Sequence, residues 1–289
     1  VEATRQGRAA DSSAPGPLIL ALSLVSAAPA EMTPLLSQAM QGEVQPELRL
    51  GYARHLIGLP QQDEALRQLV RLNAEHPAFA DGWLVHGLLL QETGQLTQAE
   101  QKLRKHVELA QASRDKEAQT GLAEALMALA QMAQRQGQLP QAEQWLAQVP
   151  PDADPIKLAS RRAGLLSQQG RMEEARQVLT QIKTTNAEQA TRKTLAQSMW
   201  MRDNKRWEEA HTLLKQALNA QPQNTDLMSE MAMVSEKLKR FDEMESVLRE
   251  LMKLKPEDPH AFNALGYSLA DRNLRLDEAR QLITQALKL

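Results

Sequence analysis

The six histidines are the residues of this chain best suited to metal binding or proton transfer. Their intervals lack the short ligand spacing of a local metal site. His76 and His106 are the one pair that could form a metal site together. Ordinary roles on the surface or in packing account better for all six histidines. We therefore expect no metal site. The histidines are His55, His76, His86, His106, His211 and His260.

Paired carboxylates offer a second route to chemistry, because two acids can share general acid and base roles. Glu173-Glu174 and Glu208-Glu209 are such pairs, but each falls where a helix is expected to begin and where carboxylates meet the positive end of the helix dipole. The sequence has no dinucleotide, phosphate-loop or zinc-protease motif, and its nearest match to a serine elbow, 266–270, lies inside an expected helix. We predict no cofactor, no catalytic residue and no enzymatic activity.

Composition narrows the range of partners. The chain has 289 residues, a net charge of −2 from 34 basic and 36 acidic side chains, and no cysteine. Disulfides and zinc-thiolate sites are thus excluded, and no bulk attraction to nucleic acid or anionic lipid is expected. No run approaches the ~20 apolar residues that span a bilayer, so we expect no direct membrane insertion.

The elements that position these residues are helices in a repeat. Short phrases such as Gly-Gln-Leu-Thr-Gln-Ala and Gly-Arg-Met-Glu-Glu-Ala end in alanine at intervals of 34, 43, 33 and 35 residues, and the series continues 34 and then 35 residues on. These positions are Ala65, Ala99, Ala142, Ala175, Ala210, Met244 and Ala279. Seven units follow, over 46–289, with starts near Pro46, Ala80, Ala123, Ile156, Thr191, Thr225 and Pro259.

Aligned units, with the phrase alanine at position 20, share further features. Position 8 is always small and position 24 is leucine in six units, which predicts two closely crossing helices with a buried knob. Glycine ends the first helix in three units, at Gly94, Gly137 and Gly170, where a left-handed residue is favoured. The interval of 43 predicts longer helices, Lys102 to Ala112 and Lys116 to Arg135, around a turn at 113–115. The sequence predicts an all-α fold.

A period near 34 with two helices per unit resembles the tetratricopeptide repeat (TPR). The resemblance implies a right-handed superhelical solenoid of helix-turn-helix repeats. Residues 224–238 and 260–273 also resemble the TPR lipoproteins that proteobacteria tether to the outer membrane facing the periplasm. This implies an adaptor for periplasmic proteins, among them a processing protease or cell-wall hydrolases, held by a lipidated N-terminus absent from this chain. A cytoplasmic TPR scaffold and a self-assembling structural protein are the alternatives.

The two ends of the chain depart from the regular repeat. Residues 1–15 are expected to be a flexible segment or the end of a preceding repeat, and 16–45 a degenerate first repeat with helices from about Gly16 to Ala27 and from Glu31 to Met40. The apolar residues 17–30 also resemble a secretory signal, and that alternative stays open. The apolar face of 282–287 has no polar cap, which predicts further repeats or self-association through this end.

Function is expected on a surface, because the repeats use their apolar faces to pack against each other. The resemblance implies a concave groove lined by positions 2, 5, 9, 12 and 13 of each first helix. Position 9 has no asparagine, so a carboxylate clamp for the C-terminal tails of chaperones is not expected. The residues at position 9 are Arg54, Leu88, Gln131, Gly164, Met199, Met233 and Tyr267. Such a mixed groove suits an extended peptide or a partner helix. The candidate binding residues are Arg54, Leu88, Gln131, Arg135, Arg192, Met199, Arg202, Asn263 and Tyr267.

Overall fold

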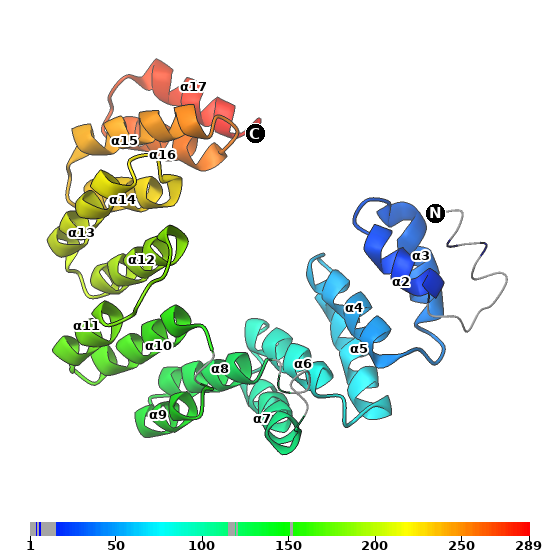
Figure 1. Ribbon diagram of the computed structural model, residues 1–289. Helices are drawn as coiled ribbons and strands as arrows, with labels where there is room; N and C mark the ends of the chain where they lie inside the picture. The colour runs from blue at the N-terminus through cyan, green and yellow to red at the C-terminus, as the bar shows by residue number, and fades with distance from the viewer. Residues whose placement is uncertain (1–3, 5, 7–15, 115–118, 120, 151–152) are drawn as a thin grey trace. The chain divides into compact units, whose positions relative to one another are not determined.

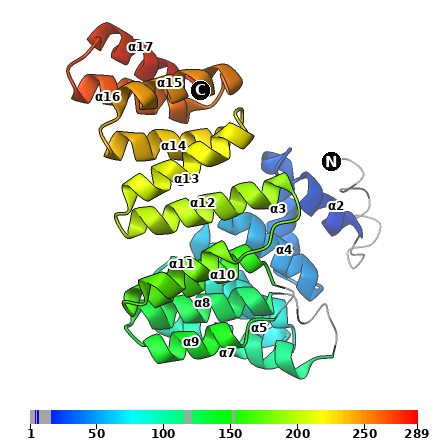
Figure 2. The same ribbon diagram turned by 60° about the vertical axis from the view of Figure 1, so that its left-hand side comes forward.

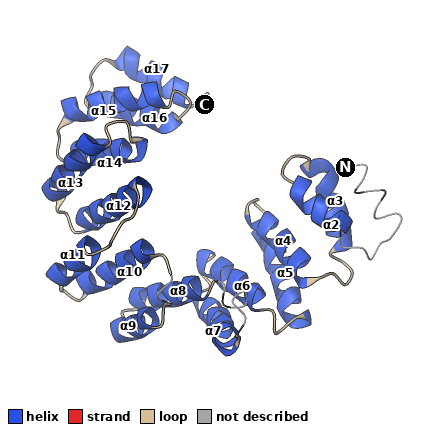
Figure 3. Ribbon diagram, viewed as in Figure 1, coloured by secondary structure: helices blue, strands red, loops and turns tan. Residues whose placement is uncertain are grey.

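The computed structural model describes residues 4, 6, 16–114, 119, 121–150 and 153–289 of the chain. Within those residues every regular element is a helix and no strand occurs (Figure 3). The predicted all-α class is confirmed. Most of residues 1–15, for which a flexible segment or the end of a preceding repeat was expected, lie outside the described residues.

The chain forms two compact units, and the first comprises residues 1–153. Consecutive helices pair as antiparallel neighbours (Figure 1), and α7 packs against both α6 and α8. Helices α2 and α3 occupy the segment where a degenerate repeat is expected. The helices of unit 1 are α2 (Gly16–Leu24), α3 (Pro29–Ala39), α4 (Pro46–Ile57), α5 (Gln62–Glu75), α6 (Ala80–Glu92), α7 (Leu96–Ala112), α8 (Leu122–Arg135) and α9 (Leu139–Ala147).

Unit 2 comprises residues 154–289 and continues the same pairing. Helix α12 contacts α10 and α14, and α13 packs against both α12 and α14, as the stacked ribbons in Figure 2 show. The helices of unit 2 are α10 (Pro155–Gln168), α11 (Met172–Thr180), α12 (Ala187–Asp203), α13 (Trp207–Ala220), α14 (Thr225–Lys237), α15 (Phe241–Leu254), α16 (Pro259–Asp271) and α17 (Leu276–Ala286).

The crossing of the two helices in a pair depends on small residues. Ala53, Ala163 and Ser198, all at position 8, are fully buried. A Cβ atom added at Gly266 would lie 2.7 Å from Cγ1 of Ile283 and 3.1 Å from the carbonyl oxygen of Ala279. Such contacts leave no room for a larger side chain. The predicted close crossing is therefore confirmed.

From α6–α7 onward, the turn inside each helix pair contains at least one left-handed residue. Gly94, Gly137 and Gly170 adopt φ of 79°, 74° and 78°, as predicted. Other pairs place a side-chain-bearing residue at the same point: Lys205, Lys239 and Asn273 have φ of 59°, 58° and 55°. The turn geometry thus comes from the helix pair and not from glycine alone.

The long interval between Ala99 and Ala142 is resolved differently from the prediction. Helix α7 is long, with 17 residues, but α8 begins at Leu122 and not near Lys116. Gly121, which precedes α8, has φ of 82°, a left-handed conformation that does not continue a helix. Residues 115–118 and 120 lie outside the described residues, and the longer second helix is a wrong prediction.

Two arginines join the first helix pair to the next. Arg49 of α4 is fully buried and donates hydrogen bonds of 2.9 Å to the carbonyl oxygens of Met40 and Gly42, just beyond the end of α3. Arg71 of α5 donates to the same two carbonyl oxygens. Burial lowers the pKa of Arg49, while Glu75, 3.2 Å away, opposes that shift. The guanidinium groups thus satisfy backbone acceptors that a helix end leaves unpaired.

Candidate protein-binding groove

Unit 2 exposes a row of large apolar side chains on its first helices. Met199 on α12, Met233 on α14 and Tyr267 on α16 are 58%, 42% and 60% exposed. Each follows the small position 8 residue that packs inside the pair, and one residue turns a helix by about 100°, so position 9 projects away from that contact. We call Met199, Met233 and Tyr267 the apolar row. Grouped exposed apolar side chains are typical of interaction surfaces.

A cavity of about 500 Å³ lies beside the apolar row, between α14 and α16. Its floor is the buried face of α15, formed by Met244, Leu248 and Leu251. Ala232, Ala261 and Ala264 form its sides, and the small size of these side chains keeps the cavity open. Its remaining lining is Ser229, Met233, Glu236, His260, Asn263 and Tyr267. The arrangement is apolar at depth and polar at the mouth, as in many ligand sites.

Glu236 gives the cavity its fixed charge. It is exposed and stands one residue before the end of α14, at the negative end of the helix dipole. In the part of the chain that the structure describes, no lysine or arginine forms an ion pair with it. A carboxylate at a helix C-terminus is electrostatically unfavourable. Glu236 is therefore the one fixed charge among the residues that line the cavity, and Lys237 follows it in the same turn.

Two predicted polar anchors have partners within unit 2. Arg192 donates to Asp154; burial raises the pKa of Asp154, but Arg192 and the backbone N–H groups of Lys157 and Ile156 outweigh this and leave the pKa lowered. Arg202 lies 2.7 Å from Glu230, which also accepts from the hydroxyl group of Ser198 at 2.8 Å. Both candidate arginines are thus ion-paired within unit 2, and their role in binding stays a prediction.

The remaining candidates divide between the units. Asn263 and Tyr267 both line the cavity, and Met199 extends the apolar row. The candidates in unit 1 are Arg54 on α4, Leu88 on α6, and Gln131 and Arg135 on α8. Arg54 and Arg135 are exposed and Leu88 is half-buried. Gln131 accepts a long hydrogen bond, of 3.5 Å, from Gln91.

Most of the residues that line the cavity were missing from the candidate set, Met233 and Glu236 among them. Met233 was signalled by its 34-residue spacing from Met199 and Tyr267. The sequence marked Glu236 only by its groove position, because the lack of an ion-pair partner can be recognised only from the folded structure.

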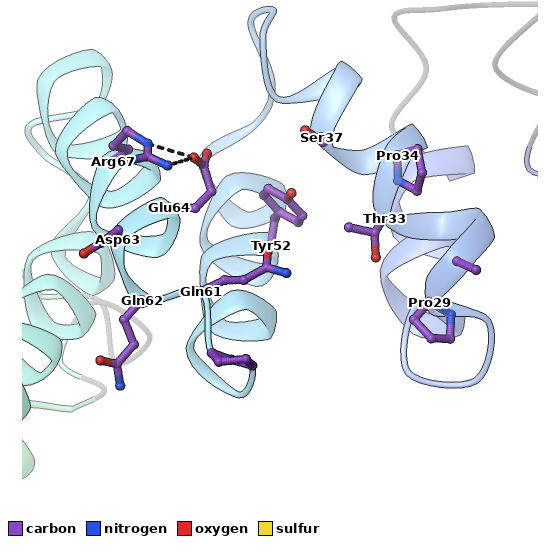
Figure 4. Close-up of a pocket in the computed structure, with 12 residues that line it drawn as sticks. Pro29, Thr33, Pro34, Ser37, Tyr52, Gln61, Gln62, Asp63, Glu64 and Arg67 are labelled. Carbon is purple, nitrogen blue, oxygen red and sulfur yellow. Dashed lines mark hydrogen bonds and ion pairs between the residues drawn. The ribbon is translucent and has the colours of Figure 1, made fainter.

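A larger hollow of about 940 Å³ lies in unit 1, between α3, α4 and the start of α5 (Figure 4). Pro29, Pro34 and Pro60 line it, and Tyr52, at 2% exposure, offers little apolar surface. Glu64 is occupied by an ion pair with Arg67 at 2.6 Å, drawn dashed in Figure 4. Without an exposed apolar anchor among its lining residues, this hollow is the weaker candidate.

Three histidines, His86, His106 and His211, are buried. His106 is fully buried, with Nδ1 2.9 Å from the carbonyl oxygen of Ala80. Over the described ranges, no three His, Asp or Glu side chains form a group that could hold a metal ion. The helices described here also include none long and apolar enough to cross a membrane.

Comparison with known proteins gives one matching family and several similar structures. The family described as "Psidin, N-terminal TPR repeats region" matches residues 156–270. A curated relative, TPR repeat-containing protein PA4667 of Pseudomonas aeruginosa, is 32% identical over 161 residues, which cover 56% of this chain and 27% of the relative. The chain thus spans about a quarter of that relative's length.

Two solved structures share the fold. A tetratricopeptide repeat protein from Parabacteroides merdae has a TM-score of 0.52 at 12% identity, covering 84% of this chain and 98% of that one. The APC/C hetero-tetramer Cut9-Hcn1 contains a chain with a TM-score of 0.50 at 16% identity, covering 90% of this chain and 47% of that one. At these identities the likeness concerns the fold alone.

Proposed function

This chain is a tetratricopeptide-repeat protein, and we propose that it is an adaptor that binds a protein partner through the apolar row and cavity of unit 2. TPR repeats serve in general as scaffolds for protein–protein interaction. The observation that carries the proposal is the regular exposure of Met199, Met233 and Tyr267 beside an open cavity. Full burial of one such side chain contributes roughly 1.5–3 kcal/mol, so three suffice to centre an interface.

Affinity capture with alanine variants tests this role. Immobilised wild-type protein and the triple variant M199A/M233A/Y267A are each incubated with a periplasmic extract, and retained proteins are compared by mass spectrometry. We expect the triple variant to lose the main partner. Val70→Ala is the matched control, because Val70 is 57% exposed in unit 1 and its truncation leaves the groove intact. Equal capture by all three proteins would exclude the groove as the binding site.

For the location, we propose the periplasm, with the parent protein tethered to the outer membrane, and a processing protease or cell-wall hydrolases as partners. The resemblance of 224–273 to periplasm-facing lipoproteins supports this, together with the relative from Pseudomonas aeruginosa. Protease accessibility of the full-length protein in intact cells and in spheroplasts tests it. Digestion only after the inner membrane is broken would place the protein in the cytoplasm instead.

Self-association is a second candidate, favoured by the surface of unit 2 at α17. Leu276 and Leu287 are 53% and 83% exposed there. Sedimentation velocity over a hundredfold range of concentration would show dimers or longer assemblies, and L276Q/L287Q should remove them. A concentration-independent monomer would exclude this role.

A further inference from the structure

The methionines of this chain divide sharply by exposure. All twelve lie among the described residues. Met199 and Met233 are exposed, and both belong to the apolar row. Six others are at most 4% exposed: Met32, Met40, Met132, Met228, Met231 and Met244. The remaining four are half-buried: Met127, Met172, Met201 and Met252. The two methionines that are open to solvent thus lie on the surface that we propose for partner binding.

Methionine differs from other apolar side chains because its sulfur atom can be oxidised and reduced again. A lone pair of the sulfur attacks one oxygen of hydrogen peroxide, and the O–O bond breaks. The departing hydroxide takes the proton of the transferred oxygen, so the products are the sulfoxide and one water. The sulfur loses two electrons and the peroxide gains them. A sulfoxide reductase reverses the change, with two thiols oxidised to a disulfide and one water released.

The rest of the chain leaves these two sulfur atoms as the favoured targets. Cysteine thiolates also react with peroxide, but the chain has no cysteine. The buried methionines are packed among apolar side chains, as Met228 and Met244 are in one core cluster of unit 2. Peroxide reaches such side chains only when the helices around them open. Oxidation should therefore begin at Met199 and Met233.

Oxidation changes the chemical character of the apolar row. A sulfoxide is polar, and its oxygen accepts hydrogen bonds, whereas the thioether is apolar. Because Met199 and Met233 face solvent, water can solvate the sulfoxides and the helices remain folded. Only Tyr267 then remains unmodified in the row. A partner that buries the row would lose apolar contacts at two of its three positions.

We propose that Met199 and Met233 form a reversible oxidation site, at which peroxide makes the apolar row polar and weakens its binding of a partner, and at which a sulfoxide reductase restores it. The effect on a partner rests on the proposed function. The selectivity of oxidation and the change in surface polarity depend on the fold alone.

Peptide mapping by mass spectrometry tests the selectivity. The whole chain is treated with hydrogen peroxide, and the rate of sulfoxide formation is measured at each of the twelve methionines. We expect Met199 and Met233 to react about tenfold faster, or more, than the six buried methionines. In urea, where the chain is unfolded, the twelve rates should converge. Equal rates at exposed and buried methionines in the folded chain would overturn the proposal.

Retention on a hydrophobic-interaction column tests the change in polarity without a partner. Oxidised wild-type protein should elute earlier than untreated protein. M199L/M233L keeps an apolar surface but has no sulfur to oxidise in the row, so peroxide should leave its retention unchanged. M127L/M172L is the matched control, because these methionines are half-buried and lie outside the row, and it should respond as the wild type does. Unchanged retention of the fully oxidised wild type would refute the proposal.

Partner capture tests the consequence for binding. Oxidised wild-type protein should retain about tenfold less of the main partner, and treatment with sulfoxide reductases of both stereospecificities should restore capture. M199Q/M233Q should capture poorly without oxidation, and M199L/M233L should capture equally before and after it. If M199A/M233A/Y267A loses the partner but the oxidised wild type does not, the oxidation proposal fails and the adaptor role stands. If the triple variant retains every captured protein while the oxidation is selective and lowers column retention, the adaptor role fails and the oxidation site stands.

Discussion

His86 couples the stability of unit 1 to pH. It is 4% exposed, and the amide nitrogen of Asn73 lies 2.9 Å from its Nδ1 atom. Burial lowers the pKa of His86 from 6.5 to about 4, and the charge of Lys102 adds to the shift. Above pH 6.5 the imidazole is neutral in both states. As the pH falls from 6.5 toward 4, the unfolded chain binds a proton that the folded chain does not, so the free energy of unfolding decreases.

His86→Gln should remove that pH dependence. Between pH 7.5 and 5, the wild type should lose roughly 2 kcal/mol more than the variant in the free energy of unfolding, since one pKa unit corresponds to about 1.4 kcal/mol. Urea titrations at both pH values measure this. His260→Gln is the control, because His260 is exposed. Parallel losses in wild type and H86Q would contradict the prediction.

The left-handed lysines give a second residue-scale prediction. Lys205 and Lys239 have φ of 59° and 58°, a conformation that glycine adopts without steric cost. Because glycine also gains freedom in the unfolded chain, each substitution to glycine should raise the free energy of unfolding by only about 0.5–1 kcal/mol. Thermal melts of K205G, K239G and the double variant measure this. Lys255→Gly is the control, because Lys255 has φ of −131° and its substitution should not raise the free energy of unfolding. A similar rise there would show that relief of backbone strain is not the cause of the effect at Lys205 and Lys239.

At the scale of elements, α3 depends on side chains from α4 and α5. Arg49 donates to the carbonyl oxygens of Met40 and Gly42 and also, at 2.8 Å, to the side-chain oxygen of Gln68. Replacing this guanidinium would remove three hydrogen bonds from this junction and leave Arg71 as the remaining side-chain donor to the carbonyl oxygens of Met40 and Gly42. The attachment of the α2–α3 pair therefore depends on the buried cation of Arg49 together with Arg71.

Arg49→Met should reduce the free energy of unfolding of this region by about 1–3 kcal/mol, the usual cost of taking a hydrogen-bond partner away from buried polar groups. Hydrogen exchange should accelerate in α2 and α3 while unit 2 keeps its protection. Arg54→Met on the same helix is the control, because Arg54 is exposed. Full protection of α2 and α3 in R49M would show that apolar packing alone holds the pair.

At the scale of the whole molecule, stability should be local because each helix pair contacts only its neighbours. Leu214 on α13 and Leu69 on α5 are both fully buried, in different units. Leucine to alanine at such sites costs about 2–5 kcal/mol. L214A should raise hydrogen exchange in α12 to α14 and leave α4 and α5 unchanged, and L69A should do the reverse. A uniform rise across all helices would indicate one cooperative fold.

The sequence by itself determined the helix pairs, their small crossing residues and the left-handed turns. Ala53, Leu69 and Gly94 illustrate this, since each acts on residues within its own unit and the 34-residue period shows its place directly. The exposure of Met199 and Tyr267 also followed from the period, because a residue beside a buried position projects outward on a helix.

Tertiary structure decided which groups remain available to a partner. Arg202 meets Glu230 and Arg192 meets Asp154 across 28 and 38 residues of sequence, while Glu236 has no such cationic partner in the described residues. The cavity over α15 likewise opens only because α14 and α16 stand apart above it. Periodicity is a short-range property of one helix pair, whereas ion pairing and cavity volume depend on distances between side chains of different pairs, which only the packed repeats fix.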